Sequence, residues 1–156
     1  MLPQSFPPEP ELQNIGEVKL TQSASLMQNL EAVSTKYESA FPKSMEDLDQ
    51  FHGLILYRKK VKGYYNQKLH LDGLADRAYI FVDGEYKGLI YRNDEEHSID
   101  IGKIAGEVQL DILVESMGRT NYGIHMHDRK GVSQIRLGNQ ILLVGKSLNS
   151  AYNQHK

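Results

Sequence analysis

The segment that most constrains the fold is 78–90, which reads AYIFVDGEYKGLI. Two runs rich in aromatic and β-branched residues flank the dipeptide Asp83-Gly84. These two residues accept the positive φ angles of a type I′ turn, whose twist matches that of the strands on either side. The segment therefore predicts an antiparallel hairpin, with Asp83 and Gly84 as its structural turn.

Short apolar runs of the same kind recur from Gly53 to Leu142, separated by Gly, Asp and Asn, and long helical periodicity is missing. Within them Leu110, Ile112 and Val114 alternate with polar residues, so one face of that strand should be buried. The total comes to eight or nine strands, which predicts an all-β jelly-roll β-sandwich. The further strands are expected at 54–61, 65–71, 98–101, 132–137 and 140–144.

Local signals divide the chain into three parts. Residues 1–14 read as a Pro-rich linker with an extended backbone, because four prolines fall between Leu2 and Pro10. Residues 15–146 form the expected sandwich domain, and residues 147–156 a polar, frayed tail.

Three further elements are expected before the hairpin. The alternating stretch 16–21 (GEVKLT) predicts a first strand, and 23–33 a short helical or irregular excursion. One short helix is expected at 44–48, where Ser44 is placed to cap a turn whose first residues are acidic.

Composition excludes several classes of partner. The absence of cysteine excludes disulfides and thiolate metal sites, and no cofactor is expected. The formal net charge of −2 supplies no global field that would attract nucleic acid or an anionic membrane. No apolar run approaches the roughly 20 residues that span a bilayer.

The densest group of candidate binding residues is the loop 118–123 (GRTNYG). In one interpretation Gly118 and Gly123 permit unusual backbone angles, while Arg119, Asn121 and Tyr122 face a ligand. In the other, Arg119 pairs with a carboxylate and Asn121 hydrogen-bonds the loop backbone.

Other motifs favour structural interpretations. His125 and His127 would share one face of a strand, but no third ligand lies nearby, so no metal is expected. The basic run 58–62 with the tyrosines that follow resembles a single-strand nucleic-acid surface, yet the acidic stretch 94–96 and the negative total favour a solvated strand end. No carboxylate pair stands out for glycoside hydrolysis, so no catalytic residue is assigned.

Five blocks occur in an order that resembles family 35 β-galactosidases. The resemblance implies a jelly roll of the galactose-binding-like type, which follows the catalytic (β/α)₈ barrel and precedes a second β-domain. The family's catalytic glutamates lie on barrel strands and have no counterpart here, so the chain alone should be non-catalytic. Ser116 and Lys59 depart from the family's usual Asn and Thr, and the Trp expected near Gly145 is missing. The blocks are residues 42–48, 53–58, 76–84, 110–123 and 128–131.

The resemblance also implies partners and a role. The expected partners are the barrel and the second β-domain of the parent enzyme, whose pocket the domain would help to narrow. Separately from the resemblance, a bacterial cytoplasmic location is expected in preference to secretion. Arg119, Asn121 and Tyr122 would then face the barrel and touch a galactoside at its edge. Two alternatives remain open: an autonomous galactoside-binding module and a small stand-alone hydrolase.

Overall fold

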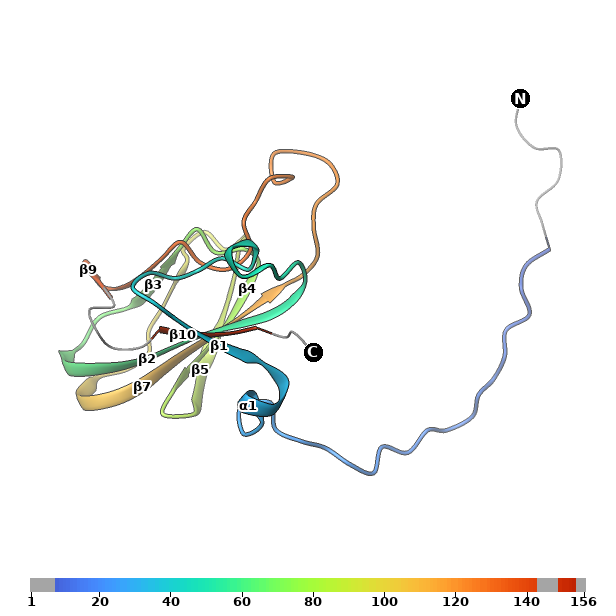
Figure 1. Cartoon of the computed structure of the whole chain (residues 1–156), viewed down its shortest axis with the longest axis horizontal. Coiled ribbons are helices and arrows are strands. Elements are labelled where there is room, and N and C mark those ends of the chain that lie inside the picture. The colour runs from blue at the N-terminus through green and yellow to red at the C-terminus, as the bar shows by residue number, and fades with distance from the viewer. Residues whose placement is uncertain (1–7, 143–148, 154–156) are drawn as a thin grey trace.

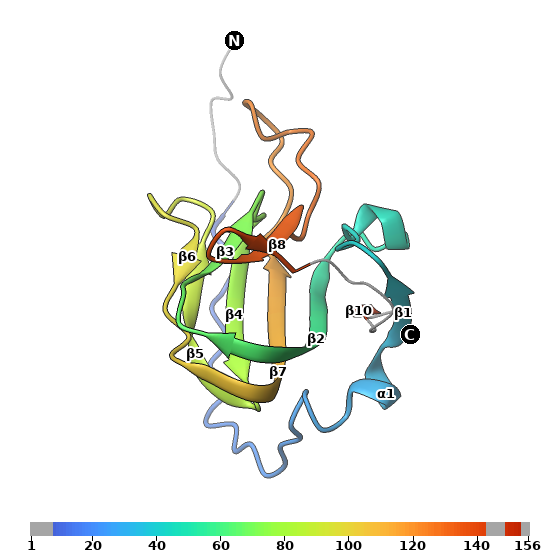
Figure 2. The ribbon, with the colours of Figure 1, turned by 90° about the vertical axis from the view of Figure 1, so that its left-hand side faces the viewer.

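Two antiparallel sheets pack face to face in this computed structural model, which describes residues 8–142 and 149–153 (Figures 1 and 2). The first sheet has the order β1-β10-β2-β7-β4-β5, and the second the order β6-β3-β8-β9. The prediction of an all-β sandwich is confirmed. The strands are β1 (Thr35–Ser39), β2 (Gly53–Tyr65), β3 (Leu69–Asp72), β4 (Arg77–Val82), β5 (Glu85–Tyr91), β6 (Ser98–Ile99), β7 (Ile104–Ser116), β8 (Gln134–Leu137), β9 (Gln140–Ile141) and β10 (Asn149–Asn153).

The predicted hairpin is confirmed as β4 and β5. Asp83 and Gly84 both have positive φ, 50° and 81°, as a type I′ turn requires. The Asp83 carboxylate accepts a hydrogen bond from the Gln109 backbone N–H at 2.7 Å, and this contact ties the turn to β7.

The core lies between the sheets and follows the predicted alternation. Leu110, Ile112 and Val114 are each no more than 2% exposed. On the outer face of the first sheet, Arg58 pairs with Asp111 at 2.8 Å and Arg77 with Glu115 at 2.5 Å. Such cross-strand ion pairs stabilise the register of the sheet, and the Asp111 side chain is only 2% exposed in its pair.

Two short helical elements precede the hairpin, α1 (Leu30–Val33) and the 3₁₀ helix η1 (Glu46–Leu48). The excursion expected within 23–33 and the short helix expected at 44–48 are therefore both confirmed. Ser44 and Asp47 exchange hydrogen bonds, since each side-chain oxygen accepts from the other residue's backbone N–H at 3.2 and 3.0 Å. No helix among residues 8–142 has the length and apolarity to cross a bilayer.

Two expectations were wrong. Residues 16–21 form no strand, and Val18 and Leu20 are 69% and 89% exposed on a segment that extends away from the sandwich (Figure 1). Alternation indicates a strand only where a partner strand is present to pair with it. Conversely, residues 149–153 of the expected frayed tail form β10 between β1 and β2. Backbone groups make that ladder, so the polar side chains gave no signal of it.

Some strand limits also differ from expectation. Residues 66–68, 100–101 and 132–133 lie outside strands, and the expected strand 140–144 ends as β9 at Ile141. Residues 143 and 144 of that expected strand lie outside the described residues, and so do residues 1–7 of the predicted linker. The predicted bounds of the linker, residues 1–14, and of the sandwich domain, residues 15–146, stay predictions.

Candidate functional site

The five sequence blocks meet at one end of the sandwich. The loop between β7 and β8, residues 117–133, rises above this end, and η1 and the start of β4 lie at its base (Figure 1). The Met45 backbone N–H donates to Lys130 O at 2.8 Å, and Ala75 and Gly131 exchange two backbone hydrogen bonds at 2.9 and 2.8 Å. Tyr57, on β2, donates its hydroxyl to Lys43 O at 2.7 Å.

An ion cluster of four side chains holds this base together. Lys130 is 2% exposed, and its Nζ lies 2.6 Å from Asp76 Oδ2. Arg92 Nη1 lies 2.8 Å from Asp76 Oδ1, and its Nη2 contacts the Asp128 carboxylate. Each buried charge thus faces an opposite charge, which is the condition under which a folded interior tolerates ions.

Glu46 joins η1 to the same loop from the other side. It accepts hydrogen bonds from Arg119 Nη2 at 2.6 Å and from the Lys130 backbone N–H at 3.0 Å. Burial alone would raise the pKa of the Glu46 carboxyl, but these and other hydrogen bonds hold that pKa below its ordinary value.

The structure separates the three candidate residues of the loop. Arg119 is held at the base, where it pairs with Glu46, as the structural interpretation expected, and donates to Phe51 O at 3.1 Å. Asn121 and Tyr122 lie farther out, and Tyr122 is 87% exposed. Gly118 and Gly123 both have positive φ, 116° and 100°. A role for the three residues at a partner or a sugar stays a prediction.

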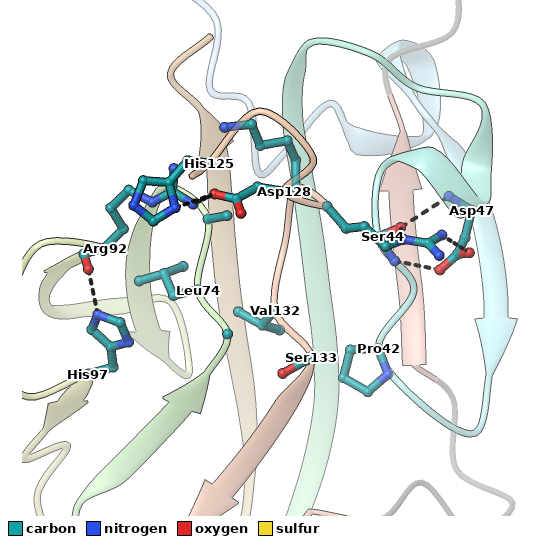
Figure 3. A pocket seen from close by; sticks show the side chains of 14 residues that line it. Pro42, Ser44, Asp47, Leu74, Arg92, His97, His125, Asp128, Val132 and Ser133 are labelled. Carbon is teal, nitrogen blue, oxygen red and sulfur yellow. Dashed lines mark hydrogen bonds and ion pairs between the residues drawn. The ribbon is translucent and has the colours of Figure 1, made fainter. Parts of the chain in front are cut away.

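A hollow of about 580 Å³ opens beside the ion cluster (Figure 3). Arg129, which lines the hollow, contacts the Asp47 carboxylate and donates from Nε to Ser44 Oγ at 3.1 Å. The hydrogen bond from the Ser44 backbone N–H lowers the pKa of Asp47, and Arg129 adds to this effect. The hollow is lined by Pro42, Ser44, Asp47, Gly73, Leu74, Ala75, Arg92, His97, His125, Asp128, Arg129, Lys130, Val132 and Ser133.

Sequence reasoning missed the ion cluster and most of the hollow. Asp76, Arg92 and Asp128 are far apart in the chain, and only the fold brings them together. A usable signal was present, since Asp76 and the run 128–131 belong to two of the five resemblance blocks.

The histidine pair also differs from expectation. Residues 124–127 form a turn, not a strand, so His125 and His127 do not share a strand face. His125 Nδ1 lies 3.1 Å from Asp128 Oδ2. Among residues 8–142 no group of three or more His, Asp or Glu side chains could hold a metal ion.

Comparison with known proteins places these blocks in one family. The profile of the family described as "Beta-galactosidase, first all-beta domain" matches residues 42–147. A β-galactosidase of Xanthomonas manihotis is 38% identical over 109 residues, which cover 70% of this chain and 18% of that protein. β-Galactosidases of Bos taurus and Homo sapiens are 36% and 37% identical, over 73% and 67% of this chain.

The match is confined to a small part of each relative, because this chain spans 16–18% of their length. The matched range contains every strand from β2 to β9 together with the ion cluster and the hollow. The chain therefore belongs to the family of the first all-β domain of β-galactosidases.

Proposed function

We propose that this chain is a non-catalytic β-domain of a family 35 β-galactosidase, which packs on the catalytic barrel and shapes access to its pocket. The parent would hydrolyse terminal β-galactosides with glutamates of the barrel, and a second β-domain would be a further partner. Family membership supports a place within a much larger polypeptide, since the relatives are about six times as long as the matched segment.

The observation that carries the proposal is the loop tip, residues 121–127. Tyr122 and Ile124 are 87% and 90% exposed, and Met126 is 49% exposed. Three large apolar side chains so close together on one projecting loop are typical of a contact surface.

The base of the loop supports the same interpretation. Arg119 at one end and Asp128 at the other are each held by an ion pair, to Glu46 and Arg92. A loop that is already anchored loses less conformational entropy when its tip binds, so more of the contact energy is available for packing.

The test uses the intact β-galactosidase that contains this domain. Tyr122→Phe should change KM or kcat by severalfold if the tyrosine hydroxyl lies at the pocket edge. Ile124→Asp should lower the melting temperature of the whole enzyme, because a charge would replace an apolar contact. The matched control is Tyr86→Phe, on a tyrosine that is 54% exposed on β5 near the hairpin turn.

Tyr86→Phe should leave both kinetics and melting temperature at the parent values. The proposal fails if Tyr122→Phe and Ile124→Asp also match the parent enzyme in both measurements.

A further inference from the structure

We propose that the outer face of the first sheet is a docking surface for helices on the outside of the catalytic barrel. The identity of this partner rests on the proposed function, but the surface is separate from the loop tip. It is the side of β2, β7, β4 and β5 that points away from the second sheet (Figures 1 and 2). The domain would then meet the barrel over a sheet face as well as at a loop.

An apolar row crosses this face from strand to strand. The register aligns one residue from each of the four strands, in the order Leu56, Leu113, Tyr79 and Leu89. Their neighbours along each strand belong to the core, so these four side chains point outward. Leu56 is 1% exposed, whereas the other three are half-buried. The row is therefore open to a partner from β7 to β5.

The outer face of the second sheet has the opposite character. The outward residues of β3, β6 and β8 are all polar: His70, Asp72, Ser98, Gln134 and Arg136. Antiparallel sheets that face water on one side usually carry polar residues there. The second sheet follows this pattern and the first does not, which indicates that the first outer face is built to meet another apolar surface.

The shape of the apolar row favours a helix as the occupant. The ion pair of Arg58 with Asp111 lies on one side of the row, and the pair of Arg77 with Glu115 on the other. Successive outward residues on a strand are about 7 Å apart, so the two charged rows are about 14 Å apart. A helix about 10 Å wide fits between them. A sheet from a second copy would need a broader apolar face and would bury both ion pairs.

The N-terminal segment lies on the same side of the molecule. Residues 8–25 extend away from the sandwich on the side of the first sheet in Figure 1, and they run behind that sheet in Figure 2. A partner on the outer face would lie next to this segment, so both could bury apolar surface against it. Four apolar residues of the segment are 69–99% exposed: Leu12, Ile15, Val18 and Leu20.

The experiment is cysteine labelling, because the chain has no cysteine of its own. Leu89→Cys places one thiol on the outer face. Its reaction with a maleimide is followed in the 156-residue chain and in the intact β-galactosidase that contains this domain, with labelled peptides resolved by mass spectrometry. The thiol should react at least about tenfold more slowly in the intact enzyme, because docking buries it. If Leu89→Cys does not fold, Tyr91→Cys at the edge of the same face takes its place.

The matched control is Gln134→Cys, since Gln134 is also half-buried but lies on the outer face of the second sheet. Its thiol should react at rates within about twofold of each other in the two proteins. The occupant is identified by attaching a benzophenone maleimide to Leu89→Cys and irradiating the intact enzyme. The cross-linked peptides should come from helices of the barrel.

Four outcomes would overturn the proposal. They are equal rates for Leu89→Cys in the two proteins, equal protection of Gln134→Cys, cross-links confined to the second β-domain, and slower labelling of the 156-residue chain as its concentration rises, which would identify a second copy as the occupant. Ile124→Cys, at the loop tip, separates this proposal from the proposed function. Protection of Ile124→Cys without protection of Leu89→Cys rejects the docking face and keeps the loop contact, whereas protection of neither rejects both.

Discussion

The buried pair of Asp76 and Lys130 permits a sharp test, because its two halves should not be equally costly to remove. Asp76 has three partners: Lys130 Nζ at 2.6 Å, Arg92 Nη1 at 2.8 Å, and the Met117 backbone N–H at 3.1 Å. Lys130 Nζ has Asp76 as its ion-pair partner among the described residues. Removing the carboxylate therefore strands a cation, whereas removing the ammonium leaves a carboxylate that is still held twice.

The expected magnitudes follow from these contacts. Lys130→Met removes one charge-assisted hydrogen bond and keeps most of the aliphatic volume, so the free energy of unfolding should fall by about 1.5–3 kcal/mol. Asp76→Ala leaves an ammonium that is 2% exposed without its carboxylate and also frees the Met117 N–H. That loss should be about 3–5 kcal/mol. The double variant Asp76→Leu/Lys130→Met removes both charges and should be more stable than Asp76→Ala alone.

The measurement is urea unfolding of the 156-residue chain, followed by circular dichroism, with the m-value checked for each variant. The control is Lys60→Met, because Lys60 pairs with Glu107 at 3.4 Å with both side chains more than half exposed. A surface pair of this kind should contribute no more than about 1 kcal/mol. The reasoning is refuted if Lys130→Met costs as much as Asp76→Ala, or if the double variant is no more stable than the single Asp76→Ala.

Two further predictions concern the same end of the sandwich. Gly131→Ala should destabilise the chain by about 2 kcal/mol or more in the same urea assay, because φ is 122° and a Cβ there would lie 2.2 Å from Tyr57 Oη. Gly84→Ala, with φ of 81° and nothing within 4 Å, should cost only about 1 kcal/mol, and equal losses would contradict the steric argument. The folded-state pKa of Glu46 lies below its ordinary value of 4.5, so its contribution to stability is present above that value and is lost as pH falls through the lower folded pKa. Glu46→Gln should therefore flatten the fall of melting temperature below about pH 4.5, and an unchanged pH profile would count against this role.

Much of the sandwich could be predicted from the sequence because its signals are local. Asp83-Gly84 specifies a turn whose φ angles few other dipeptides adopt, and the flanking runs alternate with the period of a strand. The buried face of Leu110, Ile112 and Val114 follows from the same period. In each case the information lies within about ten residues.

The predictions that were wrong concern features that the local sequence pattern does not determine. β10 is specified by pairing with strands more than 90 residues earlier in the chain, and its Asn and Ser residues have no strand preference of their own. The alternation of 16–21 was a strand pattern without a partner strand. His125 and His127 were expected on a strand, but residues 124–127 form a turn. The turn brings His125 Nδ1 within 3.1 Å of Asp128 Oδ2, three residues later in the chain.

The five resemblance blocks converge on the base of the projecting loop, residues 117–133. Each block contributes one group to the base of the projecting loop: Glu46 from the first, Tyr57 from the second, Asp76 from the third, Arg119 from the fourth and Lys130 from the fifth. Within this base the buried charges tolerate the loss of Asp76 most poorly, since the Lys130 ammonium would then be left without its carboxylate. The loop tip carries no such constraint, because Tyr122 and Ile124 face solvent in this chain. The base therefore holds the loop in position, while the tip is the part free to be adapted to whatever the domain contacts.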